Sequence, residues 1–106
     1  MSDLRQRAET VLEMSKQLLA LAEAGSWAEV ASLERRRLAA LDELFQAEAP
    51  SPEEGRLLVR TVEAVRALDG KAALLVERER DRAAGQLRKL QLGQQGERAY
   101  LAIRDE

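Results

Sequence analysis

The sequence contains neither histidine nor cysteine. It therefore has no thiol nucleophile, no disulfide, no zinc-finger spacing and no Ser-His-Asp catalytic triad. The Glu-x-x-His pairs of ferritin-like di-metal sites are excluded for the same reason, and no glycine-rich phosphate loop is present. We expect no catalytic residue, no cofactor and no metal site, so the protein is not expected to be an enzyme.

Long apolar runs and a strong net charge are missing too. No stretch approaches the roughly 20 apolar residues of a membrane span, and the N-terminus lacks the apolar core of a signal peptide. The 17 Lys and Arg residues nearly balance the 19 Asp and Glu residues, which leaves a net charge of −2. This balance gives no field that attracts nucleic acid or membranes. We expect a cytoplasmic protein that binds neither.

Aromatic and β-branched residues are scarce, whereas helix formers dominate. The three aromatics are Trp27, Phe45 and Tyr100, while Ala and Leu supply 18 residues each. This composition predicts an all-α fold, and 106 residues suit one small helical domain over residues 1–106. A core built from Leu, Val and Ala is thin for a monomer, so a partner could supply further burial.

Apolar residues spaced by three and four predict a helix over about residues 4–24. Its stripe consists of Leu4, Ala8, Val11, Met14 or Ser15, Leu18 and Ala22. Gly25 suits the left-handed position after a helix, and Ser26 with Glu29 has the Ser-x-x-Glu pattern of a capping box. A second helix is expected over about 27–47. The short turn between helices of similar length implies an antiparallel hairpin.

The stripe of the second helix is interrupted by a charge. Its members are Trp27, Val30 or Ala31, Glu34, Leu38, Leu41 and Phe45. A bare carboxylate in a core is strongly disfavoured unless it is paired. Glu34 is therefore expected either to lie at the stripe edge and pair with an Arg of a neighbouring helix, or to orient a partner or fix the packing register. Residues 35–37, all Arg, are interpreted as a solvated face flanked by acids. A nucleic-acid patch is the alternative, which is disfavoured because no aromatic or Gly-rich loop accompanies these residues.

A linker that contains Pro50 precedes a long third helix. Ser51 can cap it, Pro52 takes the first helical position, and two Glu residues meet the positive end. The apolar stripe from Leu58 to Leu90 stays in phase across Gly70, which predicts one helix over about 52–92, with a break near Gly70 as the alternative. Glycines at 93 and 96 predict its end and a short fourth helix over about 96–104. Together the helices predict an antiparallel bundle of three main helices with a short fourth.

Apolar helix surface remains as the candidate site, because such surfaces recognise other helices. Six evenly spaced residues of the third helix are expected to contact a partner, or to be core for the first two helices: Val62, Val65, Leu68, Ala72, Leu75 and Val76. The long stripe also predicts a homodimer of the unliganded protein. The apolar face of the tail is expected to act as a weak lid over this surface, or as a packing or dimer element, and it consists of Ala99, Tyr100 and Ile103.

The order of these features resembles the FliT family of flagellar export chaperones. The resemblance covers about Val11 to Tyr100 and rests on residues 25–27 (Gly-Ser-Trp), 33–35 (Leu-Glu-Arg), 50–52 (Pro-Ser-Pro) and 99–100 (Ala-Tyr). The most specific elements are Gly-x-Trp at Gly25 and Trp27, Glu34 seven residues later, and the Ala-Tyr pair near the end. None of these elements is a catalytic signature.

The resemblance implies a cytoplasmic bacterial chaperone that binds the C-terminal helical region of the filament-cap protein. It would prevent premature assembly of that protein and assist its delivery to the flagellar type III export apparatus. The family is also linked to the export ATPase complex and, in enteric bacteria, to the flagellar master transcription regulator. Because the sequence ends at Glu106, six residues after Tyr100, a function of a long C-terminal extension is not expected.

From the residues alone, the alternative function is a structural or self-associating coiled-coil protein with no chaperone role. An apolar face that stays open once the helices pack would favour the chaperone. A transcription or nucleic-acid factor is disfavoured by the net charge of −2.

Overall fold

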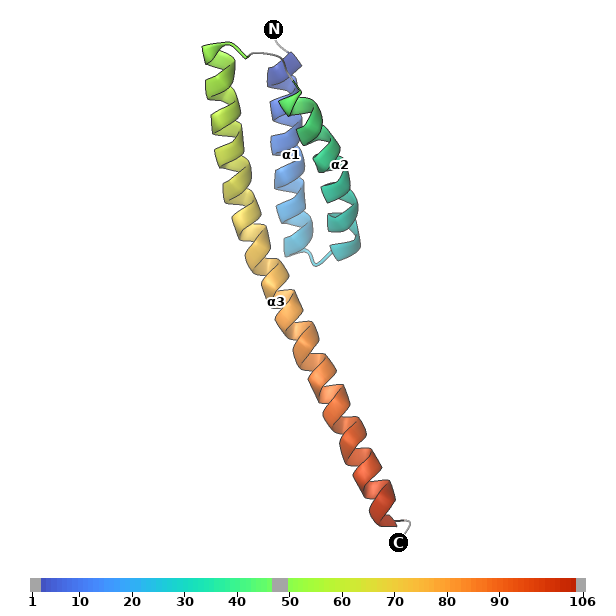
Figure 1. Cartoon of the computed structure of the whole chain (residues 1–106). Coiled ribbons are helices and arrows are strands. Elements are labelled where there is room, and N and C mark those ends of the chain that lie inside the picture. Colours follow the sequence, from blue (N-terminus) through green and yellow to red (C-terminus); the bar gives the residue numbers. More distant parts are fainter. Residues whose placement is uncertain (1–2, 47–49, 105–106) are drawn as a thin grey trace. The chain divides into compact units, whose positions relative to one another are not determined.

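A computed structural model describes residues 3–46 and 50–104, which form three helices and no strand. Helix α1 spans Asp3–Glu23, α2 spans Trp27–Phe45, and α3 spans Pro52–Arg104 (Figure 1). The all-α class and the three main helices are thereby confirmed. The predicted end of the second helix at residue 47 lies outside the described residues.

The chain divides into two compact units, Met1–Leu75 (unit 1) and Val76–Glu106 (unit 2). Unit 1 holds α1, α2 and the first part of α3. Unit 2 holds the remainder of α3. That the chain acts as one folding domain stays a prediction.

Gly25 makes the turn between α1 and α2. Its φ of 73° is left-handed, as predicted, and its N–H donates to the carbonyl of Ala22 at 3.1 Å. The N–H of Ser26 donates to the carbonyl of Leu21 at 2.9 Å, which completes a Schellman motif. These two bonds satisfy carbonyls that the end of α1 would leave free.

The capping box predicted at Ser26 and Glu29 is wrong, because the Ser26 side chain makes no capping hydrogen bond. In a capping box, the backbone N–H of the cap residue donates a hydrogen bond to the carboxylate three residues later. At Ser26 that N–H is already taken by Leu21. Two successive motifs cannot use the same donor in so short a turn.

A reciprocal capping box does occur at the start of α3. The Ser51 N–H donates to the Glu54 carboxylate at 3.2 Å, and the Glu54 N–H donates to Ser51 Oγ at 3.1 Å. Pro52 occupies the first helical position, where a missing N–H costs nothing. The predicted start of this helix is confirmed.

The C-terminal part of α3 differs from the prediction. The helix continues across Gly70 without a break and reaches Arg104, so the predicted end at 92 and the separate fourth helix over 96–104 are wrong. A helical glycine is less favourable than alanine by only about 1 kcal/mol. No proline follows Gly93 or Gly96, and the neighbouring Gln, Leu, Glu and Arg residues favour helix, so the hydrogen-bond ladder continues.

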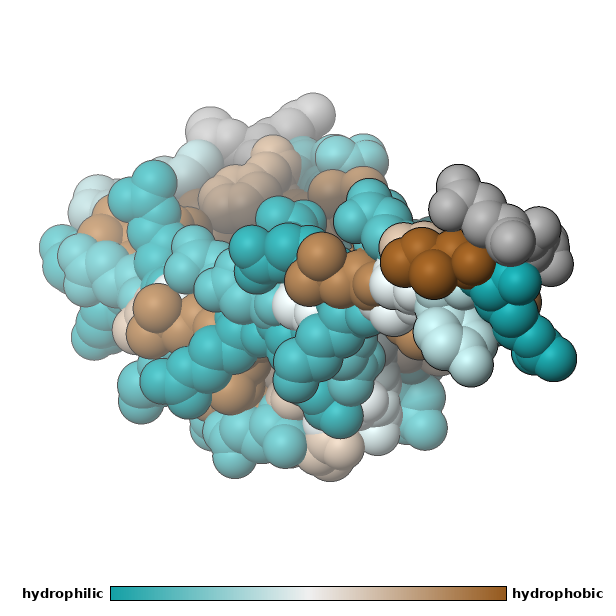
Figure 2. Space-filling view, turned by 90° about the horizontal axis from the view of Figure 1, so that it is seen from below, coloured by the Kyte–Doolittle hydropathy of each residue, from teal (hydrophilic) through white to brown (hydrophobic). Residues whose placement is uncertain are grey.

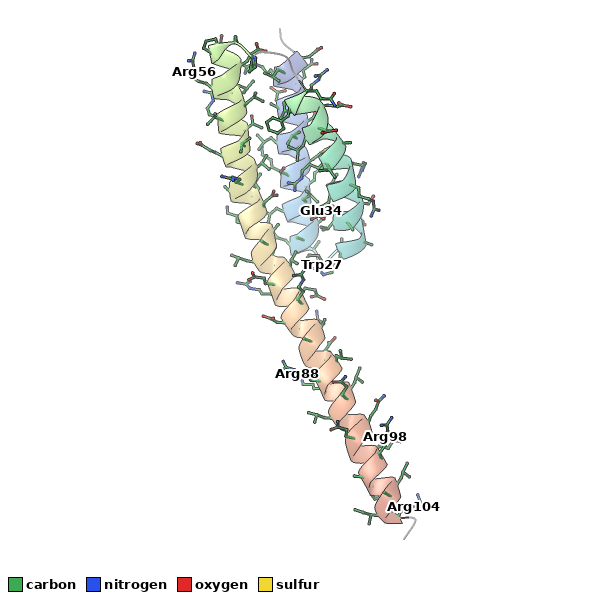
Figure 3. The ribbon with its side chains drawn as sticks, viewed as in Figure 1. Trp27, Glu34, Arg56, Arg88, Arg98 and Arg104 are labelled. Atoms are coloured by element: carbon green, nitrogen blue, oxygen red, sulfur yellow. The ribbon has the colours of Figure 1, made fainter. Side chains whose placement is uncertain are left out.

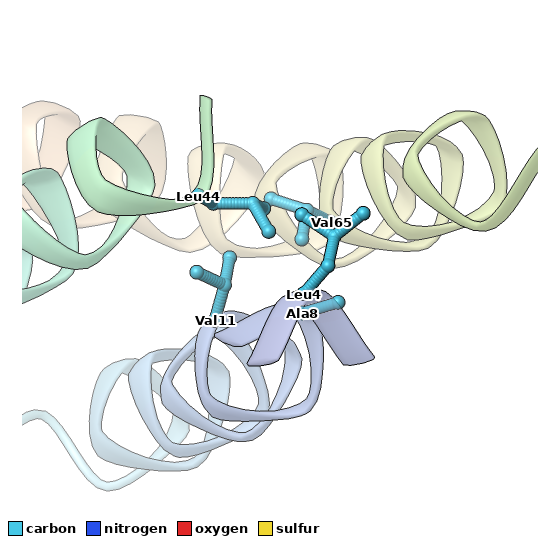
Figure 4. Close-up of a cluster of buried hydrophobic side chains, with 5 residues drawn as sticks. All are labelled: Leu4, Ala8, Val11, Leu44 and Val65. Atoms are coloured by element: carbon cyan, nitrogen blue, oxygen red, sulfur yellow. The ribbon is translucent and has the colours of Figure 1, made fainter. Parts of the chain in front are cut away.

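Buried side chains of unit 1 form two clusters. Cluster 1 joins all three helices and consists of Leu4, Ala8, Val11, Leu44 and Val65 (Figure 4). Cluster 2 joins the end of α1 to the start of α2 and consists of Leu18, Ala22, Val30 and Leu33. The start of α1 packs against the end of α2 in cluster 1, and the end of α1 packs against the start of α2 in cluster 2, so these two helices run in opposite directions. The predicted stripe of α1 is confirmed with Ser15, not Met14, as its buried central member.

The buried face of α2 is displaced by one position from the predicted stripe. Leu33 and Leu44 are buried, whereas Glu34, Leu38 and Phe45 are exposed, Leu38 at 69%. The apolar residues of α2 fit two adjacent faces, and only one of them lacks a carboxylate. The helix turns that face inward, which leaves Glu34 in water.

The turn geometry predicts opposite effects for two glycine-to-alanine substitutions. Neither site has an atom within 4 Å of an added Cβ, so the backbone alone decides. Gly25→Ala should lower the free energy of unfolding by about 1–2 kcal/mol, because φ is positive there. The matched control Gly70→Ala, inside α3, should raise it by up to about 1 kcal/mol. Urea titration measures both, and a loss of stability at Gly70 would contradict the continuous helix.

A candidate protein-binding surface

The six residues predicted to bind a partner are divided between core and partial exposure. Val65 is only 8% exposed and belongs to cluster 1, and Leu75 packs against cluster 2. The other four, Val62, Leu68, Ala72 and Val76, are half-buried. The structure therefore assigns Val65 and Leu75 to the core alternative, and whether any of the six contacts a partner stays a prediction.

A group of hydrogen-bonded polar side chains, one from each helix, lies between the two clusters. The guanidinium of Arg37 donates to Asp69 Oδ1 at 2.6 Å and to Ser15 Oγ at 3.1 Å. Ser15 Oγ in turn donates to the Val11 carbonyl at 2.9 Å. We call these residues of α1, α2 and α3 the polar node: Ser15, Arg37 and Asp69.

Burial makes the polar node more than a surface ion pair. The Arg37 side chain is 14% exposed and the Asp69 side chain 43%. Weak screening by water strengthens the attraction between the two charges, while desolvation would penalise Arg37 if its partner were lost. The node therefore links α3 to the other two helices of unit 1.

Sequence reasoning missed this role of Arg37. Arg35 and Arg36 are exposed, as predicted, but Arg37 points between the helices. The signal was its spacing, since it follows Leu33 by four residues and precedes Leu44 by seven. A side chain in that phase shares their buried face.

Three residues of the family motif, Gly25, Trp27 and Glu34, lie at the turn of the hairpin and on α2. Trp27 is partly buried and packs against cluster 2, at the start of α2 (Figure 3). Glu34 is exposed and has no hydrogen bond or ion pair within residues 3–46 and 50–104. The predicted pairing of the Glu34 side chain with an Arg is thus not formed there, and whether Glu34 orients a partner or fixes the packing register stays a prediction.

Six of the ten large exposed apolar side chains of the described residues lie in unit 2, and the other four lie in unit 1. Those of unit 2 are between 45% and 74% exposed: Leu87, Leu90, Leu92, Tyr100, Leu101 and Ile103. Apolar patches among hydrophilic residues are also visible in the space-filling view (Figure 2). Exposed apolar residues that recur along one element are typical of an interaction surface.

Helical spacing sorts these residues onto two faces of α3. Leu87, Leu90 and Leu101 are separated by three and eleven residues, so they share a face, which we call face A. Face B, on the far side, consists of Leu92, Ala99, Tyr100 and Ile103. Sequence reasoning included Leu87 and Leu90 in the long stripe but missed Leu101, because it expected the helix to end first.

All three predicted lid residues lie on face B. Ala99 is exposed, and Tyr100 and Ile103 are 65% and 74% exposed. They continue α3 instead of forming a helix of their own. A lid would require α3 to break at Gly93 or Gly96, and its existence stays a prediction.

Neither a metal-binding group nor a membrane-spanning helix is found among the described residues. Over residues 3–46 and 50–104, no group of three His, Cys, Asp or Glu side chains is placed to hold a metal ion. In the same part of the chain, no helix is both long enough and apolar enough to cross a bilayer.

Comparison with known proteins gives one match. The sequence model of the family described as "Flagellar protein FliT" matches residues 5–102, which is nearly the whole chain. Neither the curated proteins nor the solved structures gave a match.

Proposed function

The chain belongs to the FliT family of flagellar proteins, and on that premise we propose that it is a cytoplasmic flagellar export chaperone. It binds the C-terminal helical region of the filament-cap protein, prevents its premature assembly and assists its delivery to the type III export apparatus. Unit 1 acts as an antiparallel three-helix bundle that supports the long helix α3.

The exposure of face A is the observation that supports this proposal best. Leu87, Leu90 and Leu101 are 56%, 66% and 45% exposed. An amphipathic helix can lay its apolar face along such a row, and this mode of binding needs no metal, cofactor or chemistry. We place the cap segment on face A, and face B, which is equally exposed, is the surface against which the substitutions below compare it.

The residues midway along α3 suit a supporting role. Val65 and Leu75 already contact clusters 1 and 2, so a partner that used them would have to displace α1 and α2. Binding at face A leaves those contacts intact. Face A is thus the less costly place for a partner helix.

Without its partner the chaperone is proposed to be a homodimer in which face A of one copy covers face A of another. Burying a Leu side chain stabilises an interface by roughly 1.5–3 kcal/mol, so a row of exposed leucines favours self-association. The cap segment would compete with the second copy for this row.

The export ATPase complex and the flagellar master transcription regulator are further proposed partners, through the family alone. The alternative function, a structural coiled-coil protein, would use face A for self-association only. Binding of a cap segment distinguishes the two.

Charge substitutions on α3 test the binding proposal. Leu90→Asp should weaken binding of a synthetic peptide from the cap-protein C-terminus by about 30-fold or more, as expected when a hot-spot contact worth about 2 kcal/mol is lost. The matched control Ile103→Asp, on face B, should leave the affinity nearly unchanged. Isothermal titration calorimetry measures both, with far-UV circular dichroism to show that the helices remain.

Leu75→Asp tests whether the residues midway along α3 are core residues or contacts for the partner. Since Leu75 packs against cluster 2, the substitution should unfold unit 1 and lower the melting temperature. If it instead removes binding from a protein that melts normally, while Leu90→Asp binds like wild type, face A is the wrong surface.

Light scattering tests the dimer. At high micromolar concentration the protein should have twice the chain mass of 11.8 kDa, and Leu90→Asp should reduce this to one chain. A wild-type monomer at that concentration would contradict the proposed homodimer, and the peptide-binding test would still decide the chaperone proposal.

A further inference from the structure

We propose that the polar node is a register lock: the Arg37–Asp69 ion pair, supported by Ser15, admits one lengthwise position of α3 against α1 and α2 and excludes positions shifted by a turn or a heptad. This inference concerns unit 1 alone. It holds whether or not the proposed function is right.

Arg37 creates the constraint because it needs a carboxylate. Its side chain is 14% exposed and lies between the helices, so an unpaired guanidinium there would be strongly disfavoured. Ser15 satisfies part of its hydrogen-bonding capacity at 3.1 Å, but a hydroxyl carries no charge. Asp69 supplies the neutralising charge at 2.6 Å.

No other position of α3 can replace Asp69 after a shift. If α3 slides by one turn, which is three or four residues, or by a heptad of seven, another residue comes to lie opposite Arg37. The six candidates carry no carboxylate: Val62, Val65, Arg66, Ala72, Ala73 and Val76. Each shift leaves Arg37 unpaired, and one of them sets Arg66 against it.

At the centres of the two clusters the apolar contacts of α3 discriminate less between positions. Sliding by seven residues in one direction puts Leu58 where Val65 lies and Leu68 where Leu75 lies, and one aliphatic side chain then replaces another, which cores tolerate well. At the start of α3 the same slide brings Pro50 and Ser51 to the positions of Leu57 and Leu58, which pack against cluster 1, so that end of the helix opposes it as well. Single polar groups in an otherwise apolar helix interface are known to select register in this way.

Electron paramagnetic resonance distances between two spin labels test the lock. The chain has no cysteine, so Glu23→Cys in α1 and Arg60→Cys in α3 provide two label sites, both exposed in unit 1. The labelled residues lie at opposite ends of the packed region. A slide of α3 therefore changes their separation by roughly 5 Å per turn or 10 Å per heptad.

The decisive variant removes both charges, Arg37→Met with Asp69→Leu. Since apolar residues of similar size often replace a buried ion pair without loss of stability, this protein should fold and melt cooperatively. Its distance distribution should broaden or gain a second peak displaced by about 5 or 10 Å. The charge-reversed variant, Arg37→Asp with Asp69→Arg, should keep the single wild-type distance.

A matched control removes an Arg and a carboxylate outside the node: Arg36→Met with Glu63→Leu, both exposed. It should keep the single distance. If the Arg37→Met, Asp69→Leu protein also shows one unchanged distance, the apolar packing fixes the register and the proposal is overturned. Failure of that protein to fold overturns it as well, since the node would then supply stability instead of register.

Discussion

Arg37 brings a positive charge into the space between three helices, and the ion pair with Asp69 is what makes that placement possible. Much of unit 1 follows from it. The face of α2 that carries Arg37 turns inward together with Leu33 and Leu44, so Glu34 on the adjacent face is left in water. Cluster 1 and cluster 2 then form as separate apolar groups with the polar node between them. The arrangement keeps a desolvated charge paired while the aliphatic side chains pack.

How far the sequence predicts this structure depends on how many patterns compete in each helix. In α1 a single apolar stripe exists, and all six of its positions are buried as expected. In α2 two adjacent faces are apolar, and the inward face carries Arg37, whose partner Asp69 lies 32 residues away in α3. Local spacing cannot supply that partner. The end of α3 was misplaced for a different reason: glycine lowers helix stability only slightly, so Gly93 and Gly96 signal an end only where a proline or a capping partner agrees with them.

The sequence predicts apolar helix surface as the candidate site, and which residues of α3 contact a partner stays a prediction. The expectation of apolar helix surface as the recognition element agrees with the row of exposed leucines on face A, and the family match supports a flagellar role. The residues chosen from the sequence lay midway along the longest stripe, where packing against α1 and α2 also needs apolar side chains. A single stripe can serve both purposes, and only the fold shows that Val65 and Leu75 are used inside while Leu87, Leu90 and Leu101 are left outside.

The proposed function requires that a partner helix covers face A while the first part of α3 stays packed on α1 and α2. Hydrogen–deuterium exchange with and without the cap-protein peptide tests this directly, because amide protection reports local opening segment by segment. Residues 57–75 should be protected in both states. At a protein concentration below that at which the chain dimerises, residues 83–101 should exchange quickly alone and slowly with peptide. Slower exchange confined to 57–75, or faster exchange in α1 and α2 with no change over 83–101, would contradict it.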